Sequence, residues 1–128
     1  MSVETSTVES VLNLAEAMSN LDGDTELLQE IMEIFLETAE GQLAAIQSGI
    51  EAGDVKQVAV DAHGMKGGAS NFCARNFVNC ALKLELKAKE GNLDGAQELL
   101  DNMQEAFREL QEVATFINWD EVEKNWNN

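Results

Sequence analysis

The residues best suited to chemistry lie between Asp54 and Ala74, where the chain reads DVKQVAVDAHGMKGGASNFCA. This stretch contains His63, the only histidine of the protein, followed by three glycines within five positions. A neutral imidazole can serve as a base, a nucleophile or a metal ligand. Each glycine in a helix interior costs about 1 kcal/mol relative to alanine, so three of them need a reason. They leave the imidazole almost free of neighbouring bulk, with Lys66 one helical turn away. This arrangement indicates a site kept clear for the approach of another molecule.

Simpler interpretations of this stretch remain open. A single histidine on a helix is often an ordinary surface residue, and the glycines could mark a loop in place of a helix. A metal site is disfavoured, because zinc needs three or four protein ligands and the sequence has neither a second histidine nor a C-x-x-C motif. Nothing marks a serine or cysteine nucleophile paired with His63 as a base. We therefore expect no metal site.

Composition bounds the class of protein. A chain of 128 residues suits one domain with a real core. The 45% apolar content, with no proline and 5% aromatic residues, favours an all-helical fold. The net charge of −16 argues against nucleic acid or an anionic membrane as partner, because both require basic patches. Six of the eight basic residues lie between Lys56 and Lys89, in and just after the histidine stretch.

The sequence predicts a cytoplasmic protein. Its first ten residues lack the basic and apolar regions of a signal peptide. No apolar run approaches the roughly 20 residues of a membrane span. Cys73 and Cys80 stand in apolar surroundings and are interpreted as reduced packing residues, with an intramolecular disulfide as the less favoured alternative.

Apolar residues recur at helical spacing along most of the chain. The expected helices cover residues 8–20, 25–52, 54–70, 74–90 and 93–117. Long amphipathic helices joined by tight turns predict antiparallel neighbours. We therefore expect an all-α antiparallel up-and-down four-helix bundle with a short extra N-terminal helix. This domain is placed at 8–118, and 119–128 form a C-terminal tail with the apolar spacing of a short docking helix.

Several single residues indicate where these helices begin. Asp24 and Asn92 are expected to cap the helices that follow them, and Asp54 with Gln57 resembles a capping box. Gly41 lies within the long helix over 25–52, where a close helix crossing would explain it.

The twelve residues from His63 to Ala74 resemble the signature of histidine-containing phosphotransfer (HPt) domains. The family pattern runs His, any residue, an apolar residue, Lys, Gly, small residues, an apolar residue, Gly and Ala. One departure is Cys73, which stands where the family usually has glycine. Because Cys73 lies at the turn, ten residues from His63, this departure concerns the turn geometry more than the chemistry.

Two further segments extend the resemblance to about residues 10–112. Leu84-Glu85, followed by Lys89 and Gly91, is similar to a family segment near the end of the next helix. The region before and within the first long helix is similar to the corresponding part of the family.

The resemblance implies a carrier in a multistep phosphorelay of two-component signal transduction. His63 would accept a phosphoryl group from the aspartate of one receiver domain and pass it to another, with Nε2 attacking in line. Lys66 would place a cation near the phosphoryl group, and Gly64, Gly67 and Gly68 would keep space free around it. The chemistry fits, because phosphoryl transfer needs mostly positioning and charge neutralisation.

The resemblance also implies the surroundings of this site. Candidates for supporting contacts or for the rim of a partner surface are Ser70, Glu85 and Lys89. An ordinary ion pair would explain Glu85 and Lys89 equally well. The partners would be receiver domains of response regulators and a hybrid histidine kinase, and the carrier would be a monomer without a cofactor, since the receiver supplies the metal ion.

Two other classes of protein remain to be weighed. An acidic helical adaptor or inhibitor could bind a basic protein without phosphotransfer, and His63 would then be incidental. A histidine kinase is disfavoured, because the chain has no Gly-rich nucleotide loop and no room for an ATP-binding domain. We therefore expect a phosphotransfer intermediate without autokinase activity and not an enzyme.

Overall fold

The computed structural model describes residues 11–127, and this part of the chain forms helices without a strand. The helices are α2 (Leu14–Asn20), α3 (Thr25–Ala52), α4 (Val55–Ser70), α5 (Arg75–Lys89), α6 (Ala96–Ala114) and α7 (Trp119–Asn127). The prediction of an all-helical fold is confirmed. None of the helices within the described range is long and apolar enough to cross a membrane.

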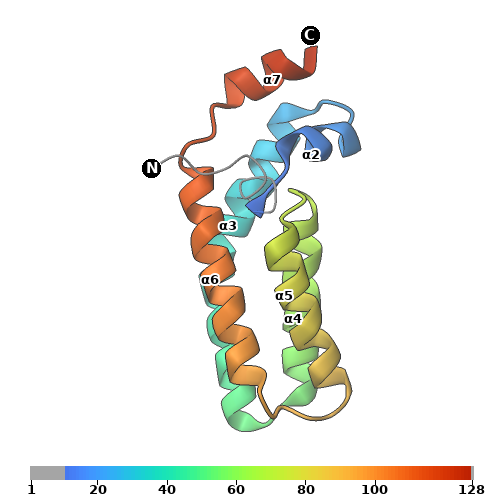
Figure 1. Cartoon of the computed structure of the whole chain (residues 1–128), viewed down its shortest axis with the longest axis vertical. Coiled ribbons are helices and arrows are strands. Elements are labelled where there is room, and N and C mark those ends of the chain that lie inside the picture. Colours follow the sequence, from blue (N-terminus) through green and yellow to red (C-terminus); the bar gives the residue numbers. More distant parts are fainter. Residues whose placement is uncertain (1–10, 128) are drawn as a thin grey trace.

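Helices α3 to α6 lie side by side along the long axis of the molecule, and α2 and α7 lie together at one end (Figure 1). Helix α4 packs against both α3 and α5, and α6 packs against α5 and α3. The helix that carries His63 therefore has a neighbour on each side, and no other described helix covers its remaining face.

Aromatic packing around Phe35 ties the helices together. The Phe35 ring on α3 makes edge-to-face contacts with Phe72, Phe77 and Phe107, at centroid distances of 5.5, 5.6 and 6.1 Å. Such pairs stabilise by about 0.5–1.5 kcal/mol beyond the area that they bury. These contacts join α3 to the α4–α5 turn, to α5 and to α6.

One apolar stripe fixes the orientation of α4. Its buried residues recur at helical spacing, and they are Val58, Ala62, Met65 and Ala69. A helix that buries one stripe leaves the opposite side chains in solvent. His63 falls outside the stripe and is exposed.

The turn between α4 and α5 contains Cys73 in a left-handed backbone conformation, with φ of 54°. Glycine adopts this conformation without strain, whereas other residues pay roughly 1–2 kcal/mol for it. The turn thus keeps the geometry that glycine favours, although cysteine occupies the position. Cys73 and Cys80 are both free thiols and are partly buried.

Two long helices begin and end as expected. The Asp24 carboxylate accepts a hydrogen bond from the Leu27 amide at the start of α3, at 3.0 Å. The Asp54 carboxylate accepts one from the Gln57 amide at the start of α4, at 3.1 Å. Because these side-chain caps are local, the sequence alone locates both helix starts.

Three expectations about helix ends are wrong. The helix expected at 8–20 is interrupted at residues 12–13, where Asn13 is extended and caps α2, which begins at Leu14; residues 8–10 lie outside the described range. Helix α6 is shorter than 93–117 at both ends. Asn92 does not cap it, since the Asn92 side chain accepts a hydrogen bond from the Asp94 amide within the loop, and left-handed Gly95 precedes α6.

The explanation for Gly41 is also wrong. Within residues 11–127, no atom from another helix lies within 4 Å of the position that a Cβ at Gly41 would occupy, so no described helix crosses there. The close approach is at Gly49, where a Cβ would lie 2.9 Å from Cγ2 of Val58. Gly49 thus allows α3 and α4 to converge at the turn that joins them.

The C-terminal tail forms α7, which packs against α2 and α3. The Trp126 indole lies over Gly23 and leaves no room for a Cβ there. Gly23 also has a φ of 79°, which favours glycine. The tail therefore docks at the α2–α3 turn, away from the middle of α4 (Figure 1).

Candidate functional site

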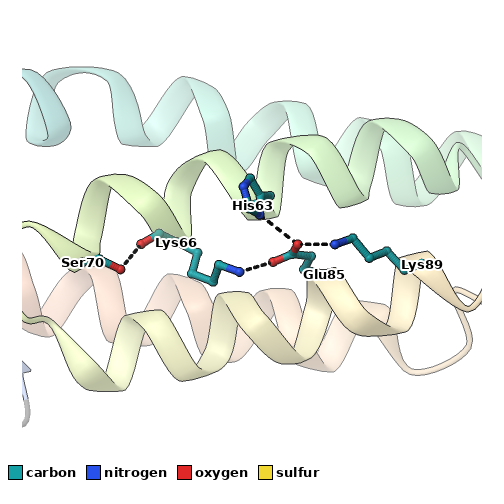
Figure 2. Close-up of polar contacts among 5 residues, drawn as sticks. All are labelled: His63, Lys66, Ser70, Glu85 and Lys89. Carbon is teal, nitrogen blue, oxygen red and sulfur yellow. Dashed lines mark hydrogen bonds and ion pairs between the residues drawn. The ribbon is translucent and has the colours of Figure 1, made fainter.

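His63 projects from α4 with its side chain 66% exposed. Its Nδ1 atom lies 2.9 Å from Oε2 of Glu85, which reaches across from α5 (Figure 2). An ionised carboxylate only accepts hydrogen bonds, so Nδ1 carries the proton and donates it. In this tautomer Nε2 has no proton and keeps a free lone pair. The contact thus leaves the second ring nitrogen of an exposed imidazole available as a nucleophile.

Glu85 is a buried carboxylate, with a side chain only 2% exposed. Lys66 Nζ lies 2.7 Å from Oε1, and Lys89 Nζ lies 2.7 Å from Oε2 (Figure 2). The hydrogen bonds from Lys66 and Lys89, assisted by the one from His63, lower the pKa of Glu85 to about 2 against the opposing effect of burial. Glu85 is therefore charged at neutral pH, and the two lysines leave the cluster with one net positive charge beside the imidazole.

The glycines near His63 have two different environments. A Cβ at Gly64 or Gly67 would contact no other part of the described chain within 4 Å, so a larger side chain there would occupy open space near the imidazole. A Cβ at Gly68 would lie 3.0 Å from the Phe35 ring of α3. The lack of a side chain at Gly68 therefore serves the packing of α4 on α3.

Of the three supporting residues expected from the sequence, Glu85 and Lys89 lie in the cluster at His63, whereas Ser70 does not contact the imidazole. The Ser70 hydroxyl donates to the Lys66 carbonyl at 2.8 Å, a bond within α4 that does not reach the imidazole (Figure 2). The Glu85–Lys89 ion pair is present, as the ordinary interpretation predicts. Sequence reasoning missed that Glu85 also holds His63 and Lys66. The signal available was an acidic residue beside the buried stripe of α5, next to Leu84.

Exposed apolar side chains occur on α4 and on the two helices that pack against it. Between α3 and α4 lies an open groove of about 260 Å³, lined by Ile31, Ile34, Phe35, Thr38, Gln42, Gly64 and Gly68. The side chains of Ile34 on α3, Val60 on α4 and Leu86 on α5 are 55%, 67% and 50% exposed. We call the groove with these three residues the apolar rim. Exposed apolar patches on a protein surface are typical of interaction sites.

Within residues 11–127, no group of three His, Cys, Asp or Glu side chains could hold a metal ion. The cluster at His63 contains one histidine and one carboxylate, and its other members are lysines. What the geometry offers is a neutral nitrogen nucleophile, a nearby positive charge and an open approach.

The fold and the site together define a helical protein with an exposed, carboxylate-bound imidazole on one helix. The family model for the Hpt domain matches residues 30–113, which span most of α3 and all of α4 and α5. The chain therefore belongs to the Hpt domain family, whose members are phosphotransfer carriers of two-component phosphorelays and not catalysts. The resemblance found in the sequence is confirmed.

A solved structure supports the same assignment. The crystal structure of histidine-containing phosphotransfer protein B (HptB) from Pseudomonas aeruginosa PAO1 is similar, with a TM-score of 0.67 and 26% sequence identity. The similarity covers 84% of this chain and 97% of that chain. A comparison with curated protein sequences gave no match.

The pKa of Glu85 predicts how stability depends on pH. The pKa falls from an ordinary 4.5 to about 2 on folding, so this carboxylate stabilises the folded state above pH 4.5. That contribution is lost as the pH falls toward 2, and the shift corresponds to about 3 kcal/mol. We expect the difference in free energy of unfolding between wild type and Glu85→Gln, measured by urea denaturation, to shrink by about 3 kcal/mol from about pH 6 to about pH 2.

Glu90→Gln is the matched control, because Glu90 is exposed at the end of the same helix. Its difference from wild type should stay within about 0.5 kcal/mol across this range. A pH-independent difference for Glu85→Gln would show that the charge of Glu85 does not stabilise the fold.

Proposed function

We propose that this protein is a phosphorelay carrier that accepts a phosphoryl group on Nε2 of His63 from the aspartate of a receiver domain and passes it to a second receiver. The observation that carries the proposal is the hydrogen bond from Nδ1 of an exposed imidazole to the buried, charged Glu85. That bond supports the tautomer in which Nε2 is free, in a chain that belongs to the Hpt domain family.

The transfer step requires no proton to leave His63. The Nε2 lone pair attacks phosphorus in line, and a phosphorus–nitrogen bond forms. The bond from phosphorus to the aspartate oxygen breaks, and its electron pair stays on that oxygen as part of a carboxylate. The ring gains positive charge, which the Nδ1–H hydrogen bond to Glu85 stabilises. Transfer to the second receiver is the same step in reverse.

Lys66 and the two open glycines suit the needs of this step. Phosphoryl transfer depends on positioning and on neutralising the equatorial oxygens. Lys66 lies one turn from His63 and its side chain is 23% exposed, so we assign it to the phosphoryl group once that group is present. Gly64 and Gly67 leave open space around the group.

We assign the apolar rim to receiver docking. A receiver must bring its aspartate to Nε2, and the rim presents exposed apolar side chains on α4, which carries His63, and on the two helices beside it. Receiver domains of response regulators are the partners of the Hpt family, and a hybrid histidine kinase is the proposed upstream source. Burial of the rim supplies binding free energy near the reacting atom.

The arrangement of the helices, the domain boundaries and the oligomeric state are part of the same proposal. The pairwise packing of α3, α4, α5 and α6 supports an antiparallel up-and-down four-helix bundle, with α2 as the short N-terminal helix. We place the carrier domain at 8–118 and treat 119–128 as the docked tail. The net charge of −16 favours a monomer through self-repulsion, and no autokinase activity is proposed.

The direct test is incubation with a phosphorylated receiver domain. Wild type should acquire acid-labile, base-stable phosphate, and His63→Gln should acquire none. Lys66→Ala should still be labelled, about 5- to 150-fold more slowly, as expected for one partly exposed charge. Gly67→Val should block transfer by crowding without changing the charge. Label that persists in His63→Gln would contradict the proposal and favour the acidic adaptor.

A second test concerns the apolar rim. Ile34→Asp should weaken receiver binding roughly tenfold or more, measured by calorimetry, because it removes apolar burial and places a charge in the interface. Phe116→Asp is the matched control: Phe116 is 87% exposed but lies between α6 and α7, outside the rim. Equal losses in both variants would exclude the rim as the docking surface.

A further inference from the structure

Glu85 has more cationic partners than its single charge requires. Lys66 contacts Oε1, whereas Lys89 and His63 both contact Oε2. The two lysines reach the carboxylate from opposite sides (Figure 2). One lysine would neutralise the carboxylate, so the second needs a reason.

The reason follows from what a phosphoryl group would do to Lys66. In the unphosphorylated protein Lys66 is held by Glu85 at 2.7 Å. A phosphoryl group on Nε2 of His63 adds negative charge within reach of the same ammonium group. The single charge of Lys66 is then shared between two anions, and Lys66 neutralises the phosphoryl group most fully when it moves away from Glu85.

The departure of Lys66 would normally be costly. Glu85 is buried, and a buried charge that loses its partner destabilises a protein strongly. Lys89 removes this cost, because it stays on Oε2 when Lys66 leaves Oε1. Lys89 lies one turn further along α5, and its side chain is 58% exposed. Its ammonium is engaged with Glu85, on the side away from Lys66 (Figure 2).

We propose that Lys89 is a positioning residue for phosphotransfer: it keeps Glu85 neutralised, so that Lys66 can exchange its ion pair with Glu85 for one with the phosphoryl group. This inference rests on the proposed carrier function. The exchange breaks and forms ion pairs only, and Lys89 acts through Glu85 and Lys66 without touching the phosphoryl group.

A double-mutant cycle tests this mechanism. The rate of phosphoryl transfer from a phosphorylated receiver would be measured for wild type, Lys89→Met, Lys66→Ala and the double variant. In the wild-type background, the substitution Lys89→Met should slow transfer roughly tenfold, because Lys66 then remains on Glu85. In the Lys66→Ala background the same change should slow transfer by a clearly smaller factor, since there is no Lys66 left to release.

Two further variants separate this role from charge or folding effects. Lys89→Arg keeps the cation and should retain transfer close to wild type. Lys83→Met removes the same charge from an exposed lysine of α5 that makes no contact with Glu85, and should also transfer at the wild-type rate. The thermal unfolding of Lys89→Met is measured alongside, so that a folding defect is recognised.

The outcomes distinguish this inference from the function on which it rests. Wild-type transfer in Lys89→Met, or slowing that is equally large with and without Lys66, would overturn the role of Lys89 and leave the carrier function intact. Phosphate found on His63→Gln, or on no variant, would overturn the carrier function and this inference with it.

Discussion

One buried carboxylate, Glu85, organises the site by joining α5 to the exposed face of α4. Burying a charge is unfavourable unless hydrogen bonds and opposite charges compensate it, and three donors on two helices provide that compensation here. The contacts that compensate the cost of burying this carboxylate also fix the imidazole and hold Lys66 in place. The geometry of His63 is therefore set by an interaction that the fold itself needs.

The surroundings of His63 show a balance between stability and access. Gly64 and Gly67 weaken α4 by about 1 kcal/mol each, and no other described element packs against either of them. The stripe that includes Val58 and Met65 offsets this loss, because tertiary packing of one face supplies most of the stability of such a helix. Helix α4 can thus be firmly packed on one side and bare on the other.

Local features of the chain allowed the starts of two helices and the buried face of α4 to be predicted from the sequence. Asp24 and Asp54 locate the starts of α3 and α4, and helical spacing separates the buried stripe of α4 from His63. Asn92 failed as a cap because its side chain bonds within the loop, a choice between local partners that spacing cannot decide. The contact between His63 and Glu85 was missed because periodicity shows which face a residue occupies and not which residue of another helix it meets.

The chemistry of the site depends on Glu85 holding the imidazole with the proton on Nδ1 and with Nε2 free. Two-dimensional nitrogen–proton NMR of the single histidine measures this tautomer directly, without a receiver or a phosphate donor. Wild type should show the Nδ1–H form at a pH where the ring is neutral, and Glu85→Ala should shift toward a mixture of both tautomers. A predominant Nε2–H form in wild type, or no change in Glu85→Ala, would contradict this role of Glu85.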